Sequence, residues 1–165
     1  MTEGAVFSLR PELEVDTAFR FALFRASRGP GWDQIPLPPE MMTKIMQQQF
    51  RAQILGYAAA YPESRREIIM VEAIAVGRLA TDRAGETLHL IDIALTPAWR
   101  GRGVGEAILR GLTDEARALS KPLTLKVDQD NLAAQRFYAR LGFVVTQADE
   151  THLDLRWDGL TAAAP

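Results

Sequence analysis

The sequence predicts a mixed α+β domain arranged around one sheet, and three observations support this class. Apolar residues recur at helical spacing in four segments, whereas seven other segments show the alternation or the short apolar runs typical of strands. These segments follow the order β-α-α-β-β-β-α-β-α-β-β, which differs from repeated βαβ units. The length of 165 residues suits one domain with its own core. We expect that domain to span residues 1–158 and residues 159–165 to form a flexible tail.

The N-terminal third is predicted to contain one strand and two helices. Residues 6–10 alternate apolar and polar side chains, as a half-buried strand does. Apolar residues at helical spacing from Val15 to Ala26 predict the first helix, and a proline-rich loop follows it. A long second helix begins at Pro39, which suits the first helical position, and it ends at residues 61–64.

The rest of the chain predicts six strands and two helices. The strands are expected at residues 67–73, 74–82, 87–95, 121–127, 143–148 and 152–157. A short glycine-containing turn at 82–86 indicates an antiparallel hairpin. One helix follows Gly103 with an apolar face, and the other begins at Asn131, a favoured N-cap residue, and ends before Gly142.

The composition argues against several classes of protein. Cysteine is absent, which excludes disulfides and thiolate chemistry, and with only two histidines we expect no metal site. The net charge of −2 gives no support for a nucleic-acid partner. No apolar run approaches the roughly 18 residues of a membrane span, and the first residues lack the pattern of a secretory signal. We therefore expect a cytoplasmic protein with neither a membrane nor a nucleic-acid partner.

The segment Arg-Gly-Arg-Gly-Val-Gly at residues 100–105 joins a predicted strand to a predicted helix. Three glycines in five residues cost backbone entropy, which implies a local requirement for them. The segment lacks the Lys-Ser/Thr of a P-loop, and Glu106 stands where a dinucleotide fingerprint needs its third glycine. A flexible basic linker, a bend without a ligand and an anion cradle are all compatible with it. A helix start with unpaired N–H groups and two nearby arginines favours the anion.

The residues around this segment resemble the GNAT acyltransferase superfamily. The family hallmark, Arg/Gln-x-x-Gly-x-Gly/Ala between the fourth strand and a helix, corresponds here to Arg100, Gly103 and Gly105. A second element, Asn, Ala, Phe-Tyr and Leu-Gly-Phe, stands in the right order across residues 131–143. The two elements cover about a third of the chain, and the N-terminal part matches only in its order of elements. The resemblance implies a GNAT-like mixed, mostly antiparallel sheet flanked by helices.

The resemblance also implies acetyl-CoA as the donor substrate. The pantetheine arm would lie between the strand ending at Leu95 and the following strand, where unpaired backbone groups can bind it like an added strand. The N–H groups that begin the next helix would hold the pyrophosphate. The implied cofactor-binding residues are Ile93, Leu95, Arg100, Gly101, Arg102, Gly103, Val104, Gly105 and Asn131. The side chains of Ile93 and Leu95 are core in either interpretation, and Asn131 has an alternative role as an N-cap alone.

Tyr138 is the residue that the resemblance points to as general acid. When an amine attacks a thioester, the departing thiolate needs a proton, and a phenol with a pKa of about 10 can supply it. Tyr138 lies two helical turns after Asn131, so we expect both to project from the same face. The alternative for Tyr138 is a core tyrosine beside Phe137.

The general base is less defined, because the family has no single base position. Asp92 interrupts an apolar strand, and His89 lies three residues before it. We favour Asp92 for substrate contact or proton relay, with His89 as second choice, and a bound water could also serve. The alternatives are a solvent-facing or internally paired carboxylate for Asp92 and a surface histidine after a hairpin turn for His89.

The sequence therefore predicts an acetyl-CoA-dependent N-acetyltransferase that acts on a primary amine. Without cysteine there is no thiol for an acyl-enzyme, so we expect direct attack in a ternary complex. The alternative is a non-catalytic acyl-CoA-binding module, and a nucleic-acid-associated module that uses Arg100 and Arg102 is less favoured because of the charge. The sequence does not identify the acceptor, although Trp32 could cover its site or merely hold a loop. The family resemblance adds a possible homodimer.

Overall fold

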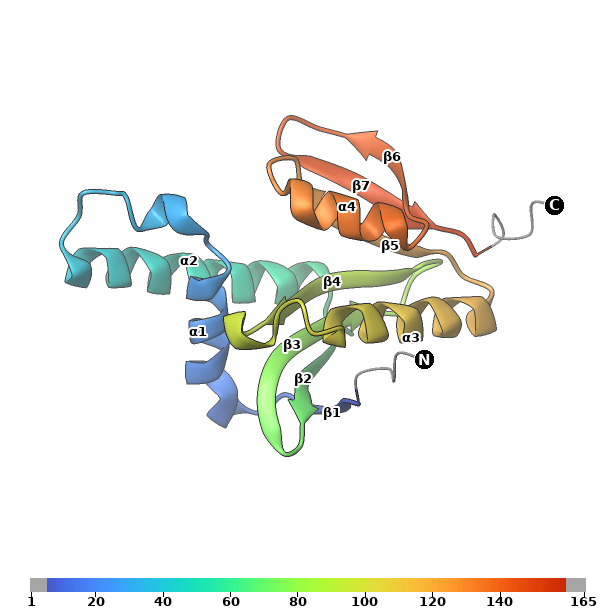
Figure 1. The fold of residues 1–165 in the computed structure, drawn as a ribbon, viewed down its shortest axis with the longest axis horizontal. Coiled ribbons are helices and arrows are strands. Elements are labelled where there is room, and N and C mark those ends of the chain that lie inside the picture. The colour runs from blue at the N-terminus through green and yellow to red at the C-terminus, as the bar shows by residue number, and fades with distance from the viewer. Residues whose placement is uncertain (1–5, 160–165) are drawn as a thin grey trace. The chain divides into compact units, whose positions relative to one another are not determined.

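The computed structural model describes residues 6–159, which form seven strands and four α-helices (Figure 1). In chain order these are β1 (Ser8–Pro11), α1 (Thr17–Ala26), α2 (Pro39–Ala60), β2 (Arg65–Val71), β3 (Ile74–Asp82), β4 (Leu88–Leu95), α3 (Val104–Leu119), β5 (Leu123–Asp128), α4 (Leu132–Arg140), β6 (Val144–Ala148) and β7 (His152–Trp157). This order confirms the sequence prediction. Apart from Gly159, the predicted tail lies outside the described residues.

The strands hydrogen-bond in the order β1-β2-β3-β4-β5-β7-β6. The pairs β1–β2, β5–β7 and β6–β7 are antiparallel, whereas β4 and β5 run parallel. The parallel pairing joins Leu88–Leu90 to Leu123–Leu125. A parallel pair needs a crossover connection, and α3 provides it. The predicted mixed, mostly antiparallel sheet is therefore confirmed.

The chain divides into two compact units, which are described separately below. The first unit comprises Met1–Ala80 and Asp92–Gly105, and the second comprises Thr81–Ile91 and Glu106–Pro165. The division passes through β4, so the two ends of this strand belong to different units. Whether residues 1–158 act as a single domain stays a prediction. Within residues 6–159, no helix is long and apolar enough to cross a membrane.

In the first unit, α1 and α2 pack through aromatic side chains. The rings of Phe21 and Phe24 lie 5.4 Å and 5.5 Å from that of Phe50, measured between centroids. Met46 joins this buried cluster, and Trp32 packs against it from the loop between the helices. As the sequence predicts, α2 begins at a proline, whose fixed φ suits the first helical turn.

The first helix starts later than predicted, because a 3-10 turn precedes it. Glu14–Asp16 form this turn, and Val15, expected on the buried helix face, is 81 % exposed. The carboxylate of Asp16 accepts hydrogen bonds from the Leu13 N–H and from Arg10, which satisfies donors at the chain's entry to α1. The expectation for Val15 is therefore wrong, because these polar contacts fix the turn.

The connection between β2 and β3 is a two-residue turn that the sequence does not signal. Glu72 and Ala73 have φ values of 48° and 67°, in the left-handed region that Asn-Gly or Asp-Gly normally occupies in such hairpins. Both residues were predicted as the end of a strand.

In the second unit, the helices α3 and α4 bury apolar residues at helical spacing, and β5 buries every second residue. The predicted face of α3 is buried at Ile108 and Leu112, but Leu119 is 45 % exposed at the helix end. On β5 the side chains of Leu123, Leu125 and Val127 are buried, as the strand alternation requires. The core of this unit therefore lies between the helices and one sheet face.

Candidate active site

The segment at residues 100–105, here called the glycine turn, follows β4 and a 3-10 turn at Pro97–Trp99. Gly101 and Gly103 have φ values of 70° and 85°, a conformation that costs other residues about 1–2 kcal/mol. A Cβ atom added at either position would meet no atom within 4 Å. These two glycines are therefore required by the backbone, and the space beside them is open.

Gly105 needs a different explanation, because it lies in the first turn of α3. A Cβ atom there would touch only Leu95 Cδ1, at 3.8 Å, which is an ordinary contact. Alanine would be favoured over glycine inside a helix by about 1 kcal/mol. Neither the backbone conformation nor packing within the first unit requires glycine at this position.

Both arginines of the glycine turn are held by neighbours in the first unit. Arg100 donates from Nε to the Leu95 carbonyl at 3.2 Å and from Nη2 to the Ala26 carbonyl at 3.3 Å. The guanidinium of Arg102 lies 4.5 Å from the centre of the Trp99 ring. Among residues 6–159, the N–H groups of residues 101–103 have no acceptor. The turn is thus fixed by its side chains while its backbone donors stay available.

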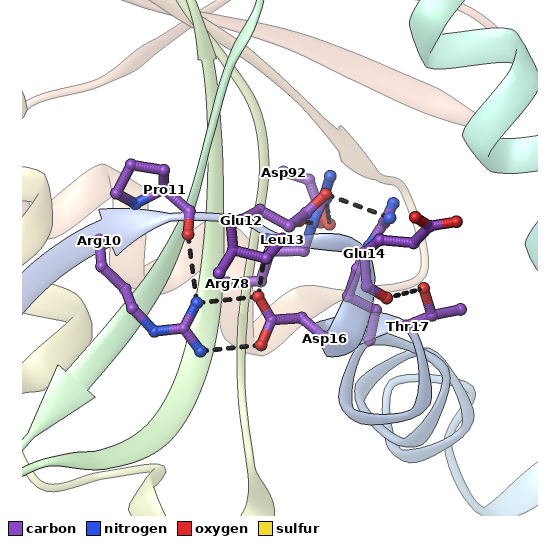
Figure 2. A network of polar contacts seen from close by, with 10 residues as sticks. Arg10, Pro11, Glu12, Leu13, Glu14, Asp16, Thr17, Arg78 and Asp92 are labelled. Atoms are coloured by element: carbon purple, nitrogen blue, oxygen red, sulfur yellow. Dashed lines mark hydrogen bonds and ion pairs between the residues drawn. The ribbon is translucent and has the colours of Figure 1, made fainter.

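Four charged residues in the first unit form a continuous chain, here called the charge network, and Figure 2 labels three of them, Glu12, Arg78 and Asp92. Asp92 Oδ2 accepts from Arg78 Nη1 at 3.2 Å, and Arg78 Nε donates to Glu12 Oε2. The other oxygen of Glu12 lies 3.1 Å from Arg20 Nη1. The side chains of Arg78 and Glu12 are only 8 % and 6 % exposed. Asp92 is therefore the internally paired carboxylate that the sequence left open as an alternative.

Asp92 differs from the rest of the charge network because its side chain is 32 % exposed. Burial raises the pKa of Asp92, and the nearby Arg78 opposes that rise. Among the described residues, Oδ1 of Asp92 has no hydrogen-bond donor. A carboxylate with one anchored and one open oxygen can bind an ammonium group or take up a proton.

The partners of Asp92 lie far from it in the sequence and were not among the predicted site residues. Arg78 lies within β3 between buried residues, and a charged residue in an apolar strand is a signal that could have revealed it. Glu12 and Arg20 carry no such signal. A separate pair lies beside them in Figure 2, where a hydrogen bond from Arg10 lowers the pKa of Asp16 to about 2.

His89 lies in the second unit, on the part of β4 that pairs with β5. Its Nδ1 atom lies 2.8 Å from the hydroxyl of Thr124, its register partner. The side chain is half-buried, and burial lowers its pKa. His89 is therefore partly covered and in contact with Thr124 rather than fully exposed. Its role as a base stays a prediction.

Asn131 and Tyr138 both belong to α4, in the second unit. The Asn131 side chain accepts from the Ala134 N–H at 3.1 Å, which confirms its predicted role as N-cap. Tyr138 is 8 % exposed, and its ring lies 5.2 Å from that of Phe137 and 5.5 Å from that of Phe143. Their roles toward the cofactor and in catalysis stay predictions.

The predicted site residues thus fall into two groups. The first unit brings the glycine turn together with Leu95, whose carbonyl and side chain contact Arg100 and Gly105, and it also holds Asp92. The second unit holds His89, Asn131 and Tyr138. Ile93 and Leu95 are half-buried rather than fully buried, because they lie near the end of β4. No cluster of histidine, aspartate or glutamate within residues 6–159 could hold a metal ion.

Sequence comparison identifies the class of protein that this fold and this turn define. Residues 49–143 match the profile described as the acetyltransferase (GNAT) family, which is more than half of the chain. The chain therefore belongs to the GNAT acetyltransferase family. The predicted fold class and family are both confirmed.

Individual relatives agree with this membership. The curated glucosamine 6-phosphate N-acetyltransferase 1 of Oryza sativa subsp. japonica is 30% identical over 120 residues, covering 66% of this chain and 67% of the relative.

The PaiA N-acetyltransferase of Thermoplasma acidophilum, solved in complex with coenzyme A, is 14% identical, with a TM-score of 0.70 over 93% of this chain and 99% of that one. YncA of Salmonella typhimurium, solved with its cofactor acetyl-CoA, is 18% identical, with a TM-score of 0.57 over 98% of each chain. At these identities the two structures are evidence for the fold.

Proposed function

We propose that this protein transfers the acetyl group of acetyl-CoA to a primary amine. The observation that carries the proposal is the glycine turn, in which anchored arginines surround backbone N–H groups without acceptors. N–H groups at the start of a helix, with the positive end of its dipole, favour a phosphate group. The proposed donor is consistent with the coenzyme A and acetyl-CoA found in the two structural relatives.

Gly105 supports the same assignment of the glycine turn. Nothing in the first unit requires glycine at this position, although alanine would stabilise the helix. A pyrophosphate that approaches the first turn of α3 closely would explain the missing side chain. The backbone groups of Ile93 and Leu95 are proposed to bind the pantetheine arm, and Asn131 to add a polar contact.

The proposed reaction is direct attack of the amine nitrogen on the thioester carbon. A C–N bond forms and the C–S bond breaks. The departing thiolate needs one proton, whereas the nitrogen of an ammonium must lose two, one before it attacks and one as the amide forms. Tyr138 is the proposed donor of the proton to the thiolate, because a phenol can protonate a thiolate within hydrogen-bond reach. Tyr138 then regains a proton from solvent.

Asp92 is the proposed acceptor of the proton that the ammonium loses before attack, and the proton lost as the amide forms passes to solvent. An alkyl ammonium with a pKa near 10 must be deprotonated before it attacks, and the raised pKa of Asp92 makes it a better base than an ordinary carboxylate. Its open oxygen is the atom proposed to accept the proton. His89 remains the second candidate, and its lowered pKa keeps the ring neutral near pH 7.

A calorimetric titration with acetyl-CoA, dephospho-CoA and ATP tests the donor site. We expect micromolar binding of acetyl-CoA, followed by thiol release in a panel of primary amines that begins with glucosamine 6-phosphate, the acceptor named for the curated relative. The absence of cysteine removes any background of protein thiol from that assay. Binding without thiol release across the panel would favour a non-catalytic acyl-CoA-binding module, and no binding would disprove the cradle.

Tyr138→Phe tests the proposed general acid. Because the phenol acts only on the leaving thiolate, kcat should fall by about 100-fold or more while the KM for acetyl-CoA changes little. Phe137→Leu, a change in the neighbouring ring, is the matched control and should leave kcat within a few-fold. An unchanged kcat in Tyr138→Phe would remove this residue from the chemistry.

The cytoplasmic location, the absence of nucleic-acid and membrane partners and the homodimer stay predictions from the sequence.

A further inference from the structure

A surface pocket in the first unit lies beside the glycine turn and shares Arg100 with it, but none of residues 101–105 lines it. Its volume is about 650 Å³, within the range of roughly 300–1,000 Å³ that is usual for small-molecule sites. Helix α1, the loop after it, α2 and Arg100 form its walls, with the lining residues Ala22, Arg25, Ala26, Gly29, Trp32, Asp33, Met46 and Arg100. The pocket therefore combines one aromatic ring and three apolar side chains with three charged groups.

Two guanidinium groups of the pocket have no acidic partner among the described residues. Arg25 makes one long hydrogen bond, from Nη1 to the Thr43 hydroxyl at 3.4 Å, and its guanidinium lies 5.8 Å from the centre of the Phe21 ring, which leaves Nε and Nη2 without an acceptor among the described residues. Arg100 is anchored by two backbone carbonyls, which leaves Nη1 available. By contrast, Arg20 and Arg78 are both paired with carboxylates in the charge network. An anionic group on a ligand would supply the missing partner.

Asp33 is the third charged group of the pocket wall, and it too has no cationic partner within residues 6–159. A ligand that carried only an ammonium would gain from Asp33 but would be repelled by Arg25 and Arg100. A ligand that carried only an anion would be attracted by Arg25 and Arg100 but repelled by Asp33. The three charges are complementary to a molecule that has one group of each sign.

Trp32 provides the surface between these charges. Its ring packs against the cluster formed with Met46, and the Arg28 guanidinium lies 5.5 Å from its centre. Trp32 therefore holds its loop and lines the pocket at the same time, so the two roles left open by the sequence are compatible. A fixed indole and a thioether offer an apolar floor for a short carbon skeleton.

We propose that this pocket binds the acceptor, and that the acceptor class is a small primary amine that also carries a carboxylate or phosphate. This inference rests on the proposed acetyl transfer, and it adds the charge that the substrate must have besides its amine. Arg25 and Arg100 hold the anionic group, Asp33 attracts the ammonium, and Trp32 packs on the carbon skeleton.

Nuclear magnetic resonance of the ¹⁵N-labelled full chain tests the proposal, with the indole N–H signal of Trp32 as the probe. The signal is assigned by its loss in Trp32→Phe, since the chain has three tryptophans. The titrants are aminoethyl phosphate and β-alanine, which carry both charges, ethanolamine, which carries only the amine, and ethyl phosphate, which carries only the anion. We expect saturable shifts from at least one of the first two, at concentrations about tenfold or more below those needed for ethanolamine and ethyl phosphate.

Two arginine variants test which charged group of the protein binds the ligand. Arg25→Gln should weaken binding of the ligand with both charges by roughly 10- to 100-fold, the loss expected for a charge-assisted hydrogen bond. Arg51→Gln is the matched control, an exposed arginine on α2 that does not line the pocket, and it should change nothing. An unchanged acetyl-CoA titration in Arg25→Gln shows that this variant is folded.

Three results would overturn the inference. They are no preference among the four titrants, an equal effect of Arg25→Gln and Arg51→Gln, and displacement of CoA by aminoethyl phosphate, which would make the pocket part of the donor site. The proposed function fails separately, when acetyl-CoA does not bind or no amine releases thiol. Binding of aminoethyl phosphate alongside acetyl-CoA, with transfer to its amine, supports both.

Discussion

The glycine turn and the charge network both belong to the first unit, but they treat their polar groups in opposite ways. In the glycine turn, the N–H groups of residues 101–103 have no acceptor among the described residues, and the space beside the two left-handed glycines is open. In the charge network, Arg78 and Glu12 are buried and paired on both sides. Asp92, at one end of the chain of contacts, is its most exposed member, at 32 % against 13 % for Arg20 at the other end.

We infer from this difference that the glycine turn serves ligand binding, whereas the charge network controls the charge of Asp92. An open set of backbone donors can accept a ligand without rearrangement, because nothing in the protein must be displaced first. The closed charge network contributes no binding of its own, but it fixes the position and the charge of Asp92. The substitutions below test whether the two regions divide the work in this way.

The largest effect is expected from Arg78→Met. The change leaves the buried Glu12 with one partner and Asp92 with none, so the free energy of unfolding should fall by about 3 kcal/mol or more. Urea denaturation measures the loss. Arg102→Met in the glycine turn removes only a cation–π contact and should cost about 1 kcal/mol or less. Equal losses in the two variants would remove the distinction between a closed network and an open turn.

Gly103→Ala should affect both stability and donor binding. Its φ of 85° makes a side chain costly, so we expect a loss of about 1–2 kcal/mol in urea denaturation and weaker acetyl-CoA binding by calorimetry. Gly105→Ala is the matched control for the backbone, because that residue is helical, and it should leave stability unchanged or raise it by up to about 1 kcal/mol. A stable Gly103→Ala would contradict the left-handed conformation.

The pH dependence of activity should report on Asp92. The base must be ionised, and its pKa is raised, so kcat/KM should fall by about tenfold for each pH unit below that pKa. Arg78 opposes the rise in pKa. Arg78→Lys keeps the charge but loses the guanidinium's forked hydrogen bonds, so it should oppose the rise less and move the acidic limb of the pH profile to higher pH. Asp92→Asn should abolish this fall of kcat/KM at low pH, together with most of the activity.

Stability should respond to the same group with the opposite sign. Because the folded state holds the proton of Asp92 more tightly than the unfolded state, this residue contributes more stability as the pH falls through its raised pKa. The difference in unfolding free energy between the wild type and Asp92→Asn, measured across that range, isolates this contribution. A difference that did not vary with pH would show that the pKa of Asp92 is not raised.

The smallest effect is expected at Ala73, which shares the left-handed conformation of Gly101 but is not a glycine. Ala73→Gly should raise the free energy of unfolding by about 0.5–1 kcal/mol, because glycine adopts a φ of 67° without strain. Donor binding should not change. Thermal unfolding provides the measurement, and a destabilised variant would show that the turn is not strained.

The sequence by itself determined the order of the elements, the position of the glycine turn and the N-cap at Asn131. Each depends on residues close together in the chain: helical or alternating spacing, a proline or asparagine at a helix start, and glycines with left-handed φ. Local errors occurred where local signals were weak, as at Val15 and at the turn of Glu72 and Ala73.

Only the tertiary structure decided which groups meet. The charge network joins residues 12, 20, 78 and 92, and the pocket joins residues 22–33 to 46 and 100. No periodicity or motif links positions so far apart, because such contacts depend on how strands and helices pack. The sequence could therefore nominate Asp92 and Trp32, but only the fold gave Asp92 an arginine partner and placed Trp32 in the wall of a charged pocket.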